Sequence, residues 1–266
     1  MTEKEYRAHP AISRSELFKI SETPEKFKYY REHPEEPTPS LLLGQLLHAM
    51  VLLQPSEVWK QFAIIPNIDK RTKAGKDAHA AFVADCGDKI PVTYDMAQQA
   101  EAMSKAILSN EYARKLLDGE REKEFFWTDD LTGEECKCRV DVLTRIGDTN
   151  VIVDLKSADS AETEAFVKSA IKYGYDFQSA MYTEGVKANT HKDYTFVFIV
   201  VEKNPPYAVN ILQADKLFVL RGYDLFREYI GTYHYCRESN NWYGYLGKHN
   251  LINVLGLPSY LAKEIE

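Results

Sequence analysis

The sequence predicts an α/β fold in which a β-sheet is flanked by helices. Residues 120–156 read as a meander of at least three strands, because β-branched and apolar runs alternate there with turn residues. Two further apolar runs, YTFVFIVVE and YAVNILQ, follow and are separated by a Lys-Asn-Pro-Pro turn at residues 203–206. Around these strands, residues 95–117, 161–188 and 214–237 predict helices, the second of them interrupted by Gly174. Strands that alternate with helices in this way are typical of an α/β domain.

The first 40 residues predict two short helices and a proline-rich linker. Ser13 precedes RSELFKI and Glu16 follows three residues later, which is the pattern of a capping box. Thr23 and Pro24 then open the segment PEKFKYYRE, with proline at the first helical position. The stretch HPEEPTPS that follows predicts a linker.

An apolar helix is predicted in the segment SLLLGQLLHAMVLLQP, which begins at Ser40 and is ended by Pro55. His48 lies within this helix, on the same face as Gly44. A single histidine on an apolar helix is usually a packed core residue, so a functional role depends on what lies opposite it.

Residues 67–78, NIDKRTKAGKDA, predict a polar loop that enters a helix. Four residues of this loop are cationic, namely Lys70, Arg71, Lys73 and Lys76. The KAGK segment lacks the upstream glycine of a P-loop. Two interpretations remain, a solvated surface or a loop that contacts phosphates at a helix N-terminus.

Residues 139–156, RVDVLTRIGDTNVIVDLK, predict an antiparallel hairpin. Two β-branched apolar runs flank a Gly-Asp-Thr-Asn turn. On the second strand Asp154 and Lys156 project from the same face, because side chains alternate along a strand. With the turn centred near residues 147–148, Asp141 falls opposite Asp154, and directly opposed Cβ atoms are about 4.5–5.5 Å apart.

Two carboxylates this close require a proton or a cation between them. A hard divalent ion with oxygen ligands, Mg²⁺ or Mn²⁺, fits the pair best. Lys156 would then lie beside the ion, where it can orient or deprotonate water and offset phosphate charge. The alternative is a surface hairpin with an ordinary Asp–Lys pair. Asp154 interrupts the apolar run VIVDLK, where a carboxylate is costly, and this favours the functional interpretation.

The length and composition are those of one globular domain. The chain has 266 residues, of which 44% are hydrophobic and 27% charged, and no linker or repeat divides it into two cores. We therefore predict a single domain over residues 1–266, with a helical segment at residues 1–40 and the core with the C-terminal helices at residues 41–266. No apolar run approaches the roughly 20 residues of a membrane helix, and the polar start lacks the apolar core of a signal peptide. We expect a cytoplasmic protein.

The net charge of −7 argues against a protein that coats nucleic acid non-specifically, although it allows a locally basic channel. The four cysteines are too few for a disulfide framework in a chain of this size. An iron–sulfur cluster held by all four is conceivable, but their spacing does not indicate one. The four cysteines are Cys86, Cys136, Cys138 and Cys236.

The strand EREKEFFWTDD places Glu122, Glu124 and Phe126 on one side. The helix at residues 161–188 carries Gln178 and Tyr182 four residues apart, on one face. The aromatic C-terminal tail predicts a short final helix.

The order of these motifs resembles the PD-(D/E)XK nuclease superfamily in its RecB-like branch, and within it the RecE-type exonucleases of phages and prophages. The similar segments are LLLGQLLHAMVLLQPSE, RTKAGKDAHAAF, CKCRVDVL, VIVDLKSA and YGYDFQSAMYTEG. The resemblance extends from about Ala11 to the C-terminal LPSYLAKEI, so it covers nearly the whole chain.

The resemblance implies roles for individual residues. Asp141 and Asp154 would bind the metal, and Lys156 would be the catalytic lysine. His48 would be the active-site histidine of its helix and a further ligand. Val140 stands where the superfamily name implies proline, a position at which proline is loosely kept.

Three further positions are implied in the same site, one of them filled by either of two glutamates. Glu122 fits the acidic strand position counted back from Trp127, and Glu124 could serve in its place as a metal ligand. Gln178 and Tyr182 would lie against the site on the DNA side.

For the whole protein, the resemblance implies a restriction-endonuclease-like core with a mixed sheet of four to six strands and helices on both sides. The implied activity is Mg²⁺-dependent hydrolysis of linear double-stranded DNA from the 5′ end, with Mn²⁺ able to substitute. Such enzymes form rings, commonly tetramers, and pass the 3′ overhang to a RecT-like annealing protein. Two alternatives remain, another RecB-like nuclease (CRISPR-associated or endonucleolytic) and a non-catalytic module that binds DNA ends.

Overall fold

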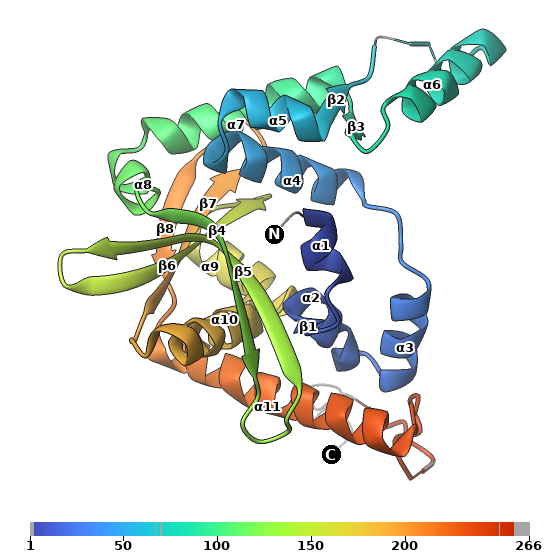
Figure 1. Ribbon diagram of the computed structural model, residues 1–266, viewed down its shortest axis with the longest axis vertical. Coiled ribbons are helices and arrows are strands. Elements are labelled where there is room, and N and C mark those ends of the chain that lie inside the picture. The colour runs from blue at the N-terminus through green and yellow to red at the C-terminus, as the bar shows by residue number, and fades with distance from the viewer. Residues whose placement is uncertain (1–2, 67, 70, 250, 258–266) are drawn as a thin grey trace.

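The computed structural model describes residues 3–66, 68–69, 71–249 and 251–257. A six-stranded mixed sheet with helices on both faces forms its centre, as predicted (Figure 1). The sheet runs in the order β1-β5-β6-β7-β8, and β4 also pairs with β5. Its strands are β1 (Ile12–Ser13), β4 (Glu120–Thr128), β5 (Glu135–Ile146), β6 (Thr149–Ala158), β7 (Thr195–Glu202) and β8 (Val209–Gln213). A separate parallel pair joins β2 (Phe62–Ile64) to β3 (Ile90–Val92).

The helices agree with the sequence pattern except at one position. The helix predicted at residues 95–117 is two helices, because Asn110 ends the first and its side-chain oxygen accepts a hydrogen bond from the backbone of Ala113 at the start of the second. The final helix predicted in the tail lies outside the described residues. The helices are α1 (Glu3–Ala8), α2 (Arg14–Leu17), η1 (Phe18–Ser21), α3 (Pro24–Glu32), α4 (Pro39–Leu52), α5 (Pro55–Gln61), α6 (Lys73–Asp85), α7 (Tyr94–Ser109), α8 (Glu111–Leu116), α9 (Thr163–Lys172), α10 (Tyr175–Thr190) and α11 (Lys216–Ser239).

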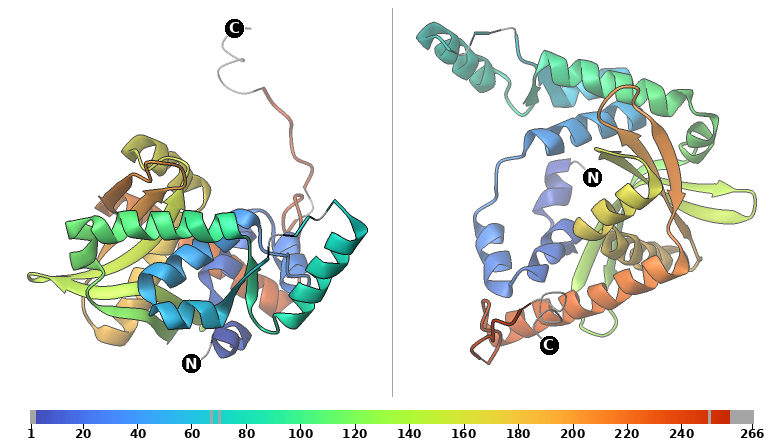
Figure 2. Two further views of the ribbon diagram at one scale, coloured as in Figure 1. Left: turned by 90° about the horizontal axis from the view of Figure 1, so that it is seen from above. Right: turned by 180° about the vertical axis from the view of Figure 1, so that it is seen from behind.

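Each face of the sheet has its own apolar core. Val153 and Leu155 of β6 pack with Leu46 of α4 on one face. Ile152 of the same strand packs on the other face with Phe177 of α10. The alternation of β6 is therefore as predicted. Each fully buried aliphatic or aromatic side chain contributes roughly 1.5–3 kcal/mol to the stability of the fold. Figure 2 shows the sheet between these two layers of helices.

The N-terminal segment packs onto the same core as the sheet. The predicted capping box is confirmed, since Ser13 and Glu16 exchange both hydrogen bonds at the start of α2. Lys137 of β5 is buried, and its ammonium donates hydrogen bonds to the carbonyl oxygens of Tyr6 and His9 at 2.7 and 2.8 Å. These bonds replace the water that a buried cation loses, and they tie the start of the chain to β5.

Strand β5 changes its neighbour halfway along its length. Its first half pairs with β1 at Cys136 and Lys137, whereas its pairing with β6 ends at Val142 and Val153. Asp141 lies between these two regions of pairing. The sheet is therefore open on this side of β5, next to Asp141.

Strand β4 is irregular at the same level. Glu122 has a φ of 50° and interrupts the otherwise continuous register with β5. A left-handed backbone at a residue other than glycine costs roughly 1–2 kcal/mol. The predicted alternation holds beyond it, with Phe125 and Trp127 buried, but it does not extend to Glu122.

Helix α6 stands away from the body of the protein (Figures 1 and 2). None of its 13 residues is buried. Thr72 caps its first turn by accepting a hydrogen bond from the backbone of Gly75. Among the described residues, no helix has both the length and the apolar character needed to cross a membrane.

Candidate active site

Asp141 and Asp154 face each other where β5 and β6 part. The last pair of the ladder is Val142 and Val153, so the next opposed residues are the two aspartates, and the predicted register is confirmed. Asp141 replaces the next rung of the ladder, since its Oδ2 accepts a hydrogen bond from the backbone N–H of Leu155 at 2.7 Å. Both carboxylates thus lie side by side at the point where the pairing of β5 with β6 ends.

Two side chains hold the carboxylate of Asp154, which is buried. Gln178 of α10 donates a hydrogen bond from Nε2 to Oδ1. The ammonium of Lys156 contacts Oδ2, and it also lies 4.7 Å from the centre of the Tyr175 ring. Oδ2 is thus engaged by an ion pair with Lys156 and by no aligned hydrogen bond.

His48 reaches this position from α4 on the other side of the hairpin. Its Nε2 lies 2.9 Å from the carbonyl oxygen of Leu155, which can only accept, so Nε2 carries the proton. Its Nδ1 lies 3.4 Å from Oδ1 of Asp141. The bond to Leu155 therefore fixes the ring with Nδ1 directed at the carboxylate, as is usual for a histidine prepared to bind a metal.

Burial and charge move the acidities of these groups in different directions. Burial lowers the pKa of His48, but the Asp141 carboxylate outweighs it and the pKa of His48 is raised. Burial raises the pKa of Asp141, but His48 and then Lys156 outweigh it and the pKa is lowered. The pKa of Asp154 is raised by burial and by Asp141, against the effect of Lys156. Asp141 is thus the ionised partner, while Asp154 favours a proton or a cation at its carboxylate.

The donor chemistry of this position fits a hard divalent ion. Asp141 and Asp154 offer carboxylate oxygens and His48 an imidazole nitrogen, and a cation bound at Oδ2 of Asp154 would take the place of the Lys156 ammonium. In the part of the chain that the structure describes, no three His, Cys, Asp or Glu side chains already converge as a metal-binding group. At present Lys156 contacts one carboxylate and the Leu155 N–H is hydrogen-bonded to the other.

The acidic residues of β4 lie beside this position. Glu122 forms an ion pair with Arg139 of β5, with 2.9 Å between Oε2 and Nε. Glu124 is the register partner of the same arginine. The assignment of either glutamate as a further ligand stays a prediction.

Of the remaining predicted residues, Tyr182 lies at the edge of the core, and the described cations of the loop lie at the base of α6. The ring of Tyr182 lies 6.4 Å from that of Phe196, at the edge of the core, and burial raises its pKa well above the usual value. Arg71 forms an ion pair with Asp69 at 2.9 Å, at the base of α6. Lys73 and Lys76 belong to the first turn of α6, away from the aspartates (Figure 1), and Lys70 lies outside the described residues.

Arg14 of α2 also reaches this region, although sequence reasoning did not identify it. Its Nη2 donates hydrogen bonds to the carbonyl oxygens of Tyr173 and Gly174, the second at 2.7 Å. Burial lowers the pKa of Arg14, while the nearby Tyr182, Tyr175 and Asp154 raise it. No local pattern marks this arginine, because its partners lie about 160 positions away in the sequence.

The cysteines lie apart from the aspartates. Cys136, Cys138 and Cys236 are buried thiols, and burial raises the pKa of each. Cys86 follows the last residue of α6, the helix that stands away from the body of the protein (Figure 1). Within the described residues these cysteines form no metal-binding group.

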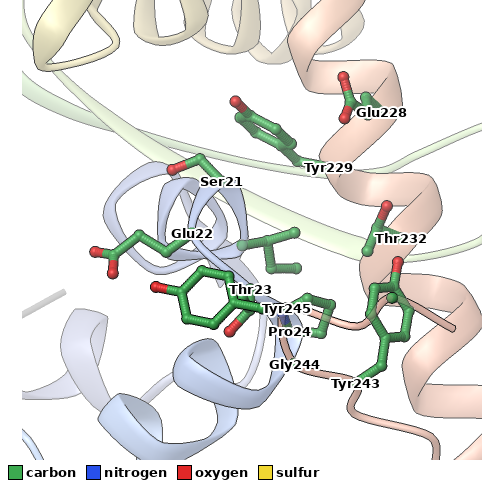
Figure 3. A pocket seen from close by; sticks show the side chains of 12 residues that line it. Ser21, Glu22, Thr23, Pro24, Glu228, Tyr229, Thr232, Tyr243, Gly244 and Tyr245 are labelled. Atoms are coloured by element: carbon green, nitrogen blue, oxygen red, sulfur yellow. The ribbon is translucent and has the colours of Figure 1, made fainter. Parts of the chain in front are cut away.

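A cavity of about 330 Å³ lies elsewhere, between the start of α3 and helix α11 (Figure 3). Its wall includes Glu22, Glu228 and three tyrosine side chains, and it contains none of the residues predicted for the site. Two carboxylates make this cavity unsuitable for a phosphate group.

Comparison with known proteins places this geometry in a family. Residues 13–254 match the family described as a PDDEXK-like domain of unknown function, DUF3799. The crystal structure of a "Putative exonuclease" from Eubacterium rectale has a TM-score of 0.63 and 15% sequence identity, over 99% of this chain and 97% of that chain. This likeness shows a shared fold.

A second structure, SSO0001, has a TM-score of 0.39 and 13% identity, over 86% of this chain and 81% of that chain. No curated protein matches the sequence. The family match covers most of the chain, including both aspartates, Lys156 and His48. The chain therefore belongs to the family of PDDEXK-like domains.

Proposed function

We propose that this protein is a divalent-metal-dependent exonuclease that degrades linear double-stranded DNA from the 5′ end. The observation that carries the proposal is the pair of opposed carboxylates, Asp141 and Asp154, with Lys156 at the same opening in the sheet. Mg²⁺ is the proposed ion, with Mn²⁺ as a substitute, because the donors are hard oxygens and one imidazole. The direction of digestion rests on the resemblance of the motifs to RecE-type exonucleases.

The side chains of the site would act on a phosphodiester in distinct ways. A bound divalent ion would polarise the scissile phosphate and lower the pKa of a water ligand. Asp141 and Asp154, with His48, would hold that ion. Lys156 would exchange its contact with Asp154 for one with the attacking water and the developing charge on phosphorus.

Other residues would keep these groups in position. Gln178 holds one oxygen of Asp154, so the carboxylate cannot rotate freely. The bond from His48 to the carbonyl of Leu155 holds the imidazole ring. Loss of such a supporting hydrogen bond commonly lowers metal affinity or activity by about 10- to 100-fold.

Digestion of one plasmid in linear and circular form, with Mg²⁺ and with EDTA, tests the activity. An exonuclease degrades only the linear form, an endonuclease nicks the circle, and a DNA-end-binding module leaves both intact. Linear DNA labelled at the 5′ or the 3′ end then gives the direction, since 5′-to-3′ digestion releases the 5′ label first. Digestion that persists in EDTA contradicts the metal requirement.

The proposed assembly is a ring, with a tetramer favoured, that passes the 3′ strand to a RecT-like annealing protein. A ring could concentrate the cations of the chain around DNA despite the net charge of −7. Light scattering after size-exclusion chromatography measures the number of subunits, and a monomer at all concentrations contradicts the ring. Binding of a purified annealing protein from the same genome to this protein, immobilised on a resin, tests the proposed partner.

A further inference from the structure

We propose that Tyr173, backed by the half-buried Tyr175 at the turn between α9 and α10, forms a stacking platform for an unpaired nucleobase near Lys156. The inference rests on the proposed function, because it assigns a second part of the substrate to the same site. It adds a class of ligand group, an unpaired base, and names the surface that would receive it.

The two rings lead from the surface to the catalytic position. The Tyr173 side chain is 49% exposed, and its ring centre lies 6.0 Å from that of Tyr175. The Tyr175 ring centre lies 4.7 Å from the ammonium of Lys156, which contacts Asp154. These two steps place the exposed ring within about 11 Å of the ammonium.

The turn that carries the platform is held rigidly. Gly174 has a φ of 65°, and a Cβ atom there would lie 2.2 Å from the ring of Phe18, so the backbone packs directly on that ring. Arg14 donates hydrogen bonds to both carbonyl oxygens of the turn. A preorganised surface loses little conformational freedom when a ligand binds.

The charges around the rings favour nucleic acid. The ammonium of Lys172 lies 5.3 Å from the Tyr173 ring centre, and the Arg14 guanidinium lies 6.0 Å from the Tyr175 ring centre. With Lys156, three cations thus surround two rings in a chain of net charge −7. Aromatic rings interleaved with cations are the usual surface for unpaired nucleotides, because bases stack while the cations attract the backbone.

A base inside a duplex already stacks on its neighbours, so only an unpaired base can use this platform. Tyr112 offers a comparison from elsewhere in the described part of the chain. Tyr112 of α8 is 71% exposed and has a lysine ammonium 5.6 Å from its ring centre, but it lies outside the site. Tyr112 is therefore the control for an exposed tyrosine beside a lysine at another place on the protein.

The test is photo-crosslinking of duplex DNA whose short unpaired end carries 5-iodouracil, bound in Ca²⁺ to prevent cleavage. Tyr173→Ala, Tyr173→Phe and Tyr112→Ala are compared with the wild type by crosslink yield, by mass spectrometry of the crosslinked peptide and by affinity. We expect the crosslink at Tyr173, and an affinity for the unpaired end that is about tenfold weaker in Tyr173→Ala. Tyr173→Phe and Tyr112→Ala should behave as the wild type.

Equal yields and affinities for Tyr173→Ala and Tyr112→Ala would overturn the platform. Digestion of linear plasmid by the wild type, run in parallel, separates this result from the proposed function. Digestion without a Tyr173-dependent crosslink refutes the platform and supports the nuclease. The crosslink without digestion supports the platform and refutes the nuclease. If the wild type neither binds nor digests DNA, both proposals are wrong.

Discussion

At the scale of single residues, Asp154 destabilises the fold because its charge is buried, and the proposed function requires that same charge. Its carboxylate is buried beside a second carboxylate, which raises its pKa and makes its charge costly in the folded state. Gln178 and Lys156 offset part of this cost. A carboxylate kept at such a position needs a cation to be fully satisfied, which is what the proposed chemistry would supply.

Asp154→Asn should abolish Mg²⁺-dependent digestion while the melting temperature stays the same or rises. Asparagine keeps the size of the side chain and removes the repulsion with Asp141, but it is a poor ligand for a hard cation. Asp148→Asn, in the exposed turn of the same hairpin, is the control and should retain activity. Near-wild-type digestion by Asp154→Asn would contradict the site assignment.

Lys156→Ala should lower the single-turnover rate of digestion by orders of magnitude, with little change in affinity for DNA ends. The reason is that its ammonium lies at the carboxylate of Asp154, at the reacting position, and away from the cations of α6. The rate is measured with Mg²⁺ and the affinity with Ca²⁺. A large loss of affinity at an unchanged rate would show that Lys156 only contacts phosphate.

At the scale of elements, the turn between α9 and α10 should be sensitive to a single methyl group. Gly174→Ala places a left-handed alanine against the Phe18 ring, which is itself packed on Phe177. We expect a loss of about 2–4 kcal/mol in the free energy of unfolding, measured in urea. Gly147→Ala, also at positive φ but with open space around the added atom, should lose only about 1 kcal/mol. Equal losses would mean that the contact with Phe18 is loose.

The contact between α10 and α11 should make stability depend on pH. Burial raises the pKa of Glu184 to about 7 despite the nearby Arg227 guanidinium. Because the folded state holds this proton more tightly than the unfolded state, stability falls as the pH rises from about 4.5 to 7. Relative to Glu184→Gln, the wild type should lose roughly 2–3 kcal/mol between pH 5 and pH 8, measured by urea unfolding. A difference that does not change with pH would contradict the raised pKa.

Long periodic elements were predictable from sequence, and local exceptions were not. The register of the hairpin follows from strict alternation on both sides of a short turn, and it correctly opposed Asp141 and Asp154. The left-handed backbone of Glu122 and the reach of Arg14 to Tyr173 depend on tertiary contacts, which leave no periodic signal. The strand β1, with two residues, is too short for any pattern to appear.

At the scale of the whole molecule, helix α6 buries none of its side chains against the rest of the protein. A helix of 13 residues with none buried is marginally stable by itself in water. Its first turn and the residues before it carry Arg71, Lys73 and Lys76, although the chain is acidic overall. An arm with a basic end, standing away from the body, is well placed to contact the phosphates of a duplex.

Arg71→Ala combined with Lys73→Ala should weaken binding to duplex ends and flatten its dependence on salt. Each phosphate contact that is lost should lower the slope of log affinity against log salt by roughly 0.9, because fewer counterions are released. Both residues lie at an exposed base, so the free energy of unfolding should change by no more than about 0.5 kcal/mol. Lys60→Ala with Lys105→Ala removes two exposed lysines from α5 and α7 and controls for net charge. Binding is measured in Ca²⁺ over a range of salt concentrations, and a slope equal to that of this control would mean that the arm is a solvated surface.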